Sequence, residues 1–328
     1  MKNALIFGVT GQDGAYLSKF LLDKGYNVSG TFRRTSHKCF ESLDQLQIFD
    51  QVNRIKADVT DPSSIQSAIR QSQPDEIYNL AAQSFVGASF QQPVLTADIT
   101  AIGTLRVLDA LKENASDAKF YQASASEMFG NSPGIKNEKS AFKPRSPYGT
   151  AKVFAHQIAN HYREAYNIFA CCGILFNHES YFRGIEFVTR RISWNLARIK
   201  FKKIKKFTLG NIHARRDWGF AGDYVESMWL MLQQDKPDDY VIATGESHSV
   251  EEFLTLASGY AGLGDWHDFV EIDESNMRPT DIDELIGDSS KAREQLGWKP
   301  KMKFKDLVKH MVEYDMNYFK LRIEQFGN

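Results

Sequence analysis

The chain has 328 residues, of which 42% are hydrophobic and 25% are charged, a composition that is ordinary for a folded globular protein and excludes a disordered or collagen-like chain. Its 40 basic and 41 acidic residues nearly cancel, so the overall charge predicts neither nucleic-acid binding nor attraction to an anionic membrane. Three cysteines are too few for a disulfide framework or a zinc site, and we expect them to be reduced and structural. No apolar run is long enough to cross a bilayer, which favours a cytoplasmic protein.

Residues 3 to about 176 alternate between short apolar runs and amphipathic stretches. The amphipathic stretches predict helices over residues 16–24, 94–113 and 148–166, and the apolar runs predict the strands ALIFGV, NVSGTF, RIKADV, EIYNLAA, KFYQAS and IFACCGILF. Strands that alternate with helices are typical of βαβ units, whose right-handed crossovers close into a doubly wound parallel sheet. The expected fold class is therefore α/β, of the Rossmann type.

The alternation is less regular after residue 177. We expect a helix over 188–200, a strand at FTLGN, a helix over 223–233, a strand at YVIATG, a helix from Val250 and a C-terminal helical pair. We expect residues 1–177 to form the nucleotide-binding domain, with about 215–245 returning to it. Residues 178–214 and 246–328 are expected to form a smaller C-terminal α/β domain that covers the sheet and binds the substrate.

Three glycines, Gly8, Gly11 and Gly14, follow the first predicted strand and begin the first predicted helix. Such a turn lets backbone N–H groups and the helix N-terminus approach a pyrophosphate; the alternative is a glycine-rich turn without a ligand. We expect a dinucleotide to contact the glycines and the residues between them, Thr10, Gln12 and Asp13.

The second predicted strand ends in TFRR, residues 31–34, where an NAD-binding enzyme would place an acid for the ribose hydroxyls. Paired guanidinium groups suit a 2′-phosphate, so Arg33 and Arg34 favour NADP; the alternative is that they are solvated surface charges. Asp58 and Val59 end the third strand and are expected beside the adenine. The end of the fourth strand is expected under the cofactor, at Leu80, Ala81, Ala82, Gln83 and Ser84.

Tyr148 and Lys152 are spaced to lie on one face of a predicted helix. An ammonium beside a phenol favours phenolate, so we expect Lys152 to lower the pKa of Tyr148 and make it a base for an alcohol proton while hydride passes to NADP. Tyr-x-x-x-Lys is common by chance on helix surfaces. Here it follows a nucleotide-binding turn and a serine-rich strand end, residues 124–130, and therefore predicts an alcohol-oxidising site.

Glu127 lies in that strand end, directly after Ser126, and both are candidate catalytic residues. If the site oxidises the 4-hydroxyl of a sugar, the ketone acidifies the proton on carbon 5. A carboxylate can then remove this proton and give it to the departing 6-hydroxyl, which is a dehydration, and hydride returns to carbon 6. A lone glutamate is more often a surface acid, but its position between Ser124 and Gly130 favours the catalytic interpretation.

The motifs GVTGQDG, FRRTS, NLAAQS, YQASASEMFG, SPYGTAK, FNHES, FVTRR, RRDWG, IATGE and RPT resemble, in this order and over nearly the whole chain, the GDP-mannose 4,6-dehydratases of the extended short-chain dehydrogenases. The resemblance implies conversion of GDP-mannose, or a close GDP-sugar, to GDP-4-keto-6-deoxymannose and water, with Tyr148 as base, Lys152 as its partner and Glu127 as acid/base. It implies cofactor contacts from His178 and Arg183. It also implies contacts to the GDP-sugar from Asn177, Val188, Arg191, Arg216 and Arg278.

The sequence departs from this family at three places. Ala125 stands where members usually carry Thr or Ser bonded to the substrate 4-hydroxyl; the loss of such a bond raises the barrier by about 1 to 4 kcal/mol, unless Ser124 or Ser126 compensates. Alternate positions on a strand end, however, point to opposite faces. The usual PRRGE is YFRGI at residues 181–185. The resemblance implies a homotetramer, but residues 37–47 do not match the family's subunit-contact loop, so a homodimer stays open.

Other interpretations remain at the level of sequence. The scaffold also suits another nucleotide-sugar 4,6-dehydratase, a 4-epimerase, a reductase or a weakly active variant, and Ala125 keeps a non-catalytic NADP-binding subunit open. The lysine-rich KFKKIKKF is more often a solvated edge than a binding site. The histidines show no ligand spacing, so no metal is expected.

Overall fold

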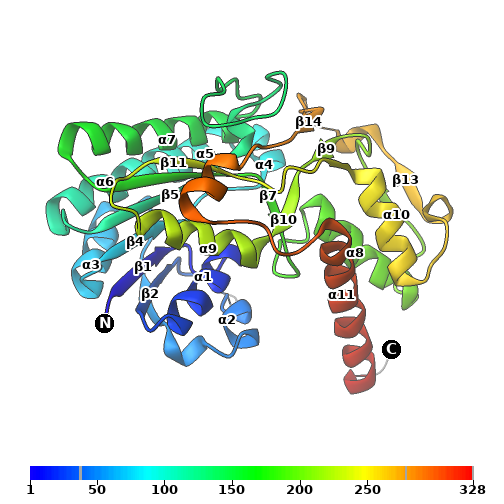
Figure 1. Cartoon of the computed structure of the whole chain (residues 1–328). Coiled ribbons are helices and arrows are strands. Elements are labelled where there is room, and N and C mark those ends of the chain that lie inside the picture. Colours follow the sequence, from blue (N-terminus) through cyan, green and yellow to red (C-terminus); the bar gives the residue numbers. More distant parts are fainter. Residues whose placement is uncertain (37–38, 278, 327–328) are drawn as a thin grey trace.

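The computed structural model of the protein describes residues 1–36, 39–277 and 279–326. Seven strands form one large sheet (Figure 1) in the order β11-β6-β5-β4-β1-β2-β3, and all neighbouring strands are parallel. This confirms the expected Rossmann-type sheet. The strands are β1 (Asn3–Phe7), β2 (Asn27–Phe32), β3 (Asn53–Lys56), β4 (Glu76–Asn79), β5 (Lys119–Ala125), β6 (Ala170–Leu175) and β11 (Asp239–Ile242).

Helices cover both faces of the sheet (Figure 1). Successive side chains of a strand point to opposite faces, so Ile6 packs in the core with α1 and α9, whereas Leu5 packs in the core with α3, α6 and α7. The bounds of these helices are α1 (Gln12–Asp23), α3 (Pro62–Ser72), α6 (Gly103–Asn114), α7 (Pro147–Tyr166) and α9 (Ala221–Leu232).

A second core lies beside the large sheet, at the right of Figure 1. Three helices and two short strands form it: α8 (Val188–Lys200), α10 (Val250–Ala261), α11 (Phe304–Phe326), β8 (Phe207–Leu209) and β13 (Val270–Ile272). Two small sheets lie between the cores. One pairs β7 (Asn177–Glu179) with β10 (Trp218–Phe220), and the other is β12 (His248–Ser249), β9 (Arg215–Arg216) and β14 (Glu284–Leu285).

The remaining elements are short. They are α2 (Glu41–Gln45), α4 (Val86–Gln91), α5 (Pro93–Thr96), the 3₁₀ turns Phe49–Gln51, Ser126–Met128, Trp266–Asp268 and Glu274–Asn276, and the π-helical segments Ala97–Ile102 and Ala292–Leu296. Residues 292–298 pack with the core of the large sheet through Ala292, Leu296 and Trp298, although 246–328 are expected in the smaller domain. Among the described residues, no helix is long and apolar enough to cross a membrane.

The start of α7 is fixed by its own sequence. The Ser146 side chain accepts a hydrogen bond from the backbone N–H of Gly149, and Pro147 occupies the first turn, where its missing N–H costs nothing. The helix ends at Asn167, which is left-handed with φ 56°. The cap places Tyr148 and Lys152 in the first two turns of α7, facing the end of β5.

Candidate active site

One cavity of about 1310 Å³ opens at the carboxyl ends of the large sheet's strands and reaches β7, β9 and α8. This is where ligands bind in open α/β sheets. Arg278 lies outside the described residues. Every other predicted site residue lines this cavity: Gly8, Thr10, Gly11, Gln12, Asp13, Gly14, Arg33, Arg34, Asp58, Val59, Leu80, Ala81, Ala82, Gln83, Ser84, Ser126, Glu127, Tyr148, Lys152, Asn177, His178, Arg183, Val188, Arg191 and Arg216.

The glycine turn forms a close cradle at the start of α1. Gly8 has φ +94°, which L side chains rarely adopt, and a Cβ on Gly14 would lie 2.3 Å from the carbonyl oxygen of Gly8. Gly11 is the N-cap of α1, so the first N–H groups of the helix face the cavity. The turn therefore fits a pyrophosphate.

The two predicted phosphate ligands lie at the rim of the cavity, directly after β2. Arg33 and Arg34 are exposed, and neither forms an ion pair within the described part of the chain. Asp58 also lines the cavity, but its Oδ1 accepts hydrogen bonds from the N–H and hydroxyl of Thr60, at 2.9 and 2.8 Å. The Asp58 carboxylate is thus bonded within its own turn and does not pair with Arg33 or Arg34. Both guanidinium groups therefore remain available to an anion at this rim.

Lys152 is held by the backbone of β5. Its Nζ donates to the carbonyl oxygen of Ala123 at 2.6 Å and lies 5.8 Å from the centroid of the Tyr148 ring. Burial lowers the pKa of Lys152 to about 8, although the charge of Asp13 opposes the shift. Near neutral pH, Lys152 is therefore close to its own titration and can both hold and release a proton.

The expected direction of the Tyr148 pKa shift is wrong. Burial raises the pKa of the Tyr148 phenol, the negative charge of Glu127 raises it further, and Arg183 opposes both. Tyr148 as a whole is only 8% exposed, and the uncharged form of the phenol is favoured in such a site. The spacing of Tyr148 and Lys152 placed the two side chains correctly, but it did not reveal the carboxylate beside them.

Glu127 stands in the 3₁₀ turn Ser126–Met128 that ends β5, and it lines the cavity. The turn packs on α7, because a Cβ on Gly149 would lie 2.8 Å from the carbonyl oxygen of Glu127. Ala125, the residue before this turn, packs with Tyr148 and Val86. The structure thus brings the candidate base and the candidate acid/base together at one strand end.

His178 forms an ion pair with Asp13 of the glycine turn. Its Nε2 lies 2.8 Å from Asp13 Oδ2 and its Nδ1 lies 2.7 Å from the carbonyl oxygen of Phe176, so both ring nitrogens donate and the ring is an imidazolium. Burial acts against both charges, but their attraction outweighs it, so the pKa of His178 is raised and that of Asp13 is lowered. The ring also stacks on Tyr224, at 4.7 Å between centroids.

Arg183 enters the cavity from the loop between β7 and α8. Its guanidinium lies 3.6 Å from the centroid of Phe187, and its Nε lies 3.2 Å from Glu179 Oε2. Glu179 is buried and also accepts a hydrogen bond from Thr189 Oγ1 at 2.7 Å. The sequence analysis missed Glu179, although its place directly after His178 in FNHES was a signal for it.

Two predicted substrate residues are anchored on the far side of the cavity. Arg216 Nη1 donates to the carbonyl oxygen of Ile282 at 2.7 Å, and its Nη2 lies 3.3 Å from Asp281. Arg191 Nη2 lies 3.5 Å from Thr208 Oγ1. Both guanidinium groups line the cavity and together make this end of it suited to a diphosphate.

The sequence model described as GDP-mannose 4,6 dehydratase matches residues 5–311. The chain is 53% identical to GDP-mannose 4,6 dehydratase 1 of Arabidopsis thaliana, over 97% of this chain and 91% of the relative, and 46% identical to the Homo sapiens GDP-mannose 4,6 dehydratase, over 95% and 91%. The chain belongs to the GDP-mannose 4,6-dehydratase family. The resemblance identified from the motifs is confirmed.

Solved structures share the fold of this family member. UDP-glucose 4-epimerase from Thermotoga maritima, with UDP-glucose, is 22% identical with a TM-score of 0.85 and covers 97% of this chain and 99% of its own. The dTDP-glucose 4,6-dehydratase from Bacillus anthracis, in complex with NAD, is 19% identical with a TM-score of 0.84 and covers 98% of each chain. RMD from Pseudomonas aeruginosa, complexed with NADPH, is 20% identical with a TM-score of 0.78 and covers 96% and 99%.

The departures from the family pattern lie around the cavity. Ala125 contributes only a methyl group beside Tyr148. In the loop that replaces PRRGE, Tyr181 stacks on Tyr314 of α11 at 4.1 Å between ring centroids, and Phe182 packs on Tyr16 of α1 at 5.3 Å. Aromatic packing thus occupies the place of one lost arginine.

Proposed function

We propose that this chain converts GDP-mannose, or a close GDP-sugar, to GDP-4-keto-6-deoxymannose and water, with NADP recycled in the site. Membership of the family over residues 5–311 supports the reaction. The main observation in support of this reaction is that the glycine turn, Tyr148, Lys152 and Glu127 all line one cavity.

The cavity fits a nicotinamide dinucleotide. The Gly8–Gly14 cradle suits the pyrophosphate, and solved proteins of the same fold carry NAD or NADPH. Arg33 and Arg34, exposed at the rim, support NADP over NAD, because a 2′-phosphate supplies the anion that two guanidinium groups favour. The bound cofactor supplies a nicotinamide that accepts and returns hydride and that is positively charged when oxidised.

Tyr148 is the proposed base for the 4-hydroxyl. Its raised pKa means that the phenol binds this proton firmly once it has taken it, so phenolate must be favoured by positive charge close by. Lys152, fixed on the carbonyl of Ala123, holds its ammonium on the same helix face. Arg183 favours phenolate in the same way.

Glu127 is the proposed carrier of the proton from carbon 5. The carboxylate removes this proton after carbon 4 has become a ketone, and gives it to the 6-hydroxyl as the carbon–oxygen bond breaks, which forms water. Carbon 5 then needs a proton as hydride reaches carbon 6. The proton that Tyr148 took from the 4-hydroxyl balances this demand, so the reaction consumes none from solvent overall.

The experiment is to incubate the protein with GDP-mannose and catalytic NADP and to follow product mass. Loss of one water without accumulation of NADPH is the expected result. An unchanged mass with a changed configuration at carbon 4 would establish epimerisation instead, because that reaction needs no group aimed at carbons 5 and 6. Recovery of unchanged GDP-mannose would mean that the protein only binds the nucleotide sugar and does not convert it.

The further assignments rest on the same proposal. We propose the two-domain division given above, apart from residues 292–298, which pack with the core of the large sheet. We also propose that Asn177, Val188, Arg191, Arg216 and Arg278 lie on the GDP-sugar side. The homotetramer or homodimer and the cytoplasmic location remain predictions. Sedimentation of the purified protein, with and without NADP, tests the first of them.

A further inference from the structure

Two contacts fix the Arg183 guanidinium in the cavity. Its Nε lies 3.2 Å from Glu179 Oε2, and its Cζ lies 3.6 Å from the centroid of the Phe187 ring. The Arg183 side chain is 18% exposed, whereas that of Glu179 is only 2% exposed. Within the described residues, the guanidinium makes no aligned hydrogen bond, so its position depends on the charge of Glu179 and on the aromatic ring.

Glu179 is itself held by a second element. Thr189 Oγ1, in the first turn of α8, donates to Glu179 Oε2 at 2.7 Å, and both residues are buried. Glu179 is also the last residue of β7, where it pairs with Phe220 of β10. The carboxylate is therefore fixed through its backbone and through its side chain before it meets Arg183.

The backbone between Glu179 and Arg183 forms a turn that brings the arginine back to the strand. The N–H of Arg183 donates to the carbonyl of Ser180 at 3.1 Å. Ser180 Oγ donates to Gln12 Oε1 at 2.7 Å, and Gln12 Nε2 donates to the carbonyl of His178 at 3.1 Å. Gln12 belongs to the glycine turn, so this turn and the ion pair are attached to each other.

Charges of alternating sign surround Arg183. Asp13 and His178 form one ion pair, at 2.8 Å, and Glu179 and Arg183 form the other. The two cations repel each other, so Arg183 needs a carboxylate of its own to stay beside His178. Glu186, three residues along the loop, is exposed and forms no ion pair with Arg183 in the described part of the chain. The buried Glu179 is therefore the counter-charge.

The charge of Arg183 acts on Tyr148, the proposed base. Burial raises the pKa of Tyr148, the charges of Glu127 and Asp13 add to the shift, and Arg183 opposes it. Lys152 lies on the same helix face, with its Nζ 5.8 Å from the ring centroid. The side chains that pack on the ring from α4 and β5 are apolar. Arg183 thus offsets carboxylates that disfavour phenolate.

We propose that Glu179 is a positioning residue for the oxidation at carbon 4: it holds the Arg183 guanidinium where the positive charge favours transfer of the 4-hydroxyl proton to Tyr148. Thr189 holds Glu179 in turn. This inference rests on the proposed function. Glu179 acts through Arg183, because its own negative charge disfavours phenolate.

The first test is Glu179→Gln, which removes the charge and keeps the size of the side chain. Without its counter-charge the guanidinium moves away from the phenol, so the rise of kcat/KM for GDP-mannose with pH is displaced by roughly one unit to higher pH. Loss of a negative charge alone favours phenolate, and a direct effect of Glu179 would displace the rise to lower pH. A displacement to lower pH, or none, would overturn the inference.

The second test uses variants that keep or share the interaction. Glu179→Asp keeps the charge on a shorter side chain and recovers part of the displacement. Thr189→Val removes the hydroxyl that orients Glu179 and gives a smaller displacement to higher pH, which also tests the inference if Glu179→Gln does not fold. An unmoved profile in Thr189→Val, or a displacement in Glu179→Asp as large as that in Glu179→Gln, would contradict the positioning role.

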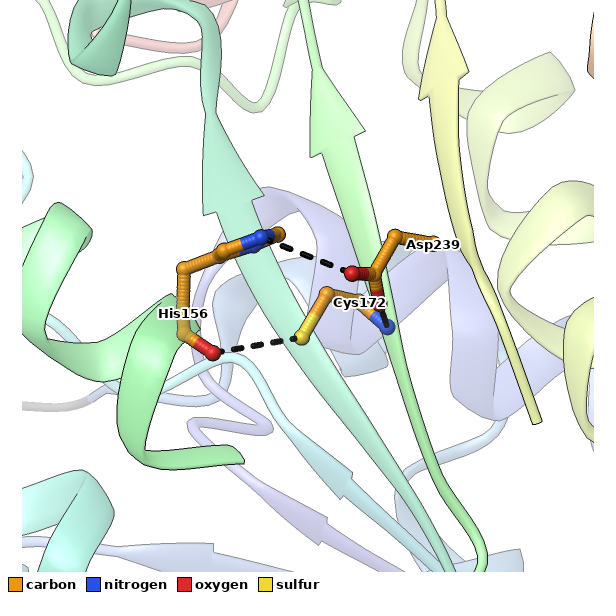
Figure 2. Close-up of side chains that lie close together, drawn as sticks. All are labelled: His156, Cys172 and Asp239. Atoms are coloured by element: carbon orange, nitrogen blue, oxygen red, sulfur yellow. Dashed lines mark hydrogen bonds and ion pairs between the residues drawn. The ribbon is translucent and has the colours of Figure 1, made fainter. Parts of the chain in front are cut away.

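Asp239→Asn is the matched control. Asp239 is also a largely buried carboxylate, 15% exposed, and it pairs with Arg163 at 3.0 Å. It lies outside the candidate cavity, on β11 beside Cys172 of β6 and His156 of α7 (Figure 2). We expect this variant to lose stability and to keep the pH profile of kcat/KM. A similar displacement in Asp239→Asn would mean that loss of any buried carboxylate produces it, and would overturn the inference.

A measurement of stability tests the pair without reference to activity. Glu179→Gln and Arg183→Gln each lower the free energy of unfolding, because each leaves a partly buried charge without its partner. In denaturant titrations the double variant loses less than the sum of the two, since both changes remove the same interaction. Additive losses would show that Glu179 does not hold Arg183.

The proposed function and this inference fail in different ways. A wild type that makes no dehydrated product from GDP-mannose would overturn both. In a wild type that dehydrates GDP-mannose, the pH profiles and the stability cycle decide the role of Glu179 alone.

Discussion

At the scale of single residues, burial raises the pKa of the Tyr148 phenol most, and the charge of Glu127 adds to the shift. Glu127 raises the pKa of the phenol, so Glu127→Gln lowers that pKa and moves the pH dependence of the oxidation step to lower pH. The same variant cannot carry the carbon 5 proton. We expect NADPH to accumulate on the enzyme in a single turnover, with dehydration slowed by roughly 100-fold or more. An unshifted pH profile would mean that the two side chains do not interact.

In the proposed site, we expect Arg33 and Arg34 to select NADP over NAD. Replacing both with Ala removes two charge-assisted hydrogen bonds to a 2′-phosphate, so NADP binding weakens by roughly 100-fold while NAD binding changes little. Binding measured by calorimetry for both dinucleotides checks this. Lys56→Ala, at the end of the neighbouring strand β3, is the control for a general loss of positive charge. Equal weakening of NAD and NADP would contradict the prediction.

The residues of the candidate site could be predicted where their chemistry requires a fixed spacing along the chain. Gly8, Gly14, Tyr148 and Lys152 are local patterns, and they meet in the cavity as expected. The direction of the Tyr148 pKa shift was not predictable, because it depends on burial and on the carboxylate from another element. A hydrogen bond between the side chains of Ser124 and His156 was missed for the same reason, since thirty-two positions separate them.

At the scale of elements, the ion pair between His178 on β7 and Asp13 on α1 gives stability that depends on pH. The pKa of His178 is raised above 6.5 on folding, so its contribution is complete below that pH and is lost as pH rises through the folded value. The pKa of Asp13 is lowered below 3.8, so its contribution is present above that pH and is lost as pH falls through the folded value.

His178→Gln therefore has its largest effect on stability at pH values between the folded pKa of Asp13 and that of His178. It lowers the free energy of unfolding by roughly 2 kcal/mol near pH 6, and the difference from wild type shrinks as the pH is raised above the folded pKa of His178. Denaturant titrations at several pH values measure it. His267→Gln, at an exposed histidine in a surface turn, serves as control. A difference that stays constant with pH would mean that His178 is not charged.

Elements were predictable where the apolar pattern was long and the boundary residues were distinctive. The helix expected over 188–200 is α8 with the same bounds, and α7 begins at its Ser-Pro cap. Helix α3 was not predicted, although Asp61 and Pro62 mark its start. Strands β9, β12 and β14 have two residues each, which is too short for any periodicity to show.

At the scale of the whole molecule, a buried ion pair joins α11 to α8. Arg190 Nη2 lies 2.6 Å from Asp315 Oδ1, both side chains are buried, and Ser193 Oγ donates to the same carboxylate. Asp315→Asn leaves a buried guanidinium without its counter-charge, so we expect a loss of roughly 3 kcal/mol in the free energy of unfolding. Glu271→Gln, which breaks an exposed pair with Lys206, changes it by no more than about 0.5 kcal/mol.

The overall architecture was predictable because βαβ alternation leaves few topologies. Strand β11 lies beside β6 because the chain returns to the large sheet after residue 215. The sequence predicted this return. Residues 292–298 were expected with the smaller domain, yet Trp298 packs beside Tyr224 of α9. No local pattern distinguishes a tryptophan of one core from that of another, so such assignments depend on tertiary contacts.

The loop of residues 180–187 is held by hydrogen bonds to its backbone and by the aromatic packing of Tyr181 and Phe182. Arg190 donates to the carbonyls of Tyr181 and Arg183, and the Ser180 hydroxyl accepts from the N–H of Phe182. The main-chain hydrogen bonds do not depend on which side chains residues 181 and 183 carry, whereas the ring of Phe182 is committed to packing on Tyr16. Ile185 is 54% exposed, so natural variation at position 185 leaves the course of the loop unchanged.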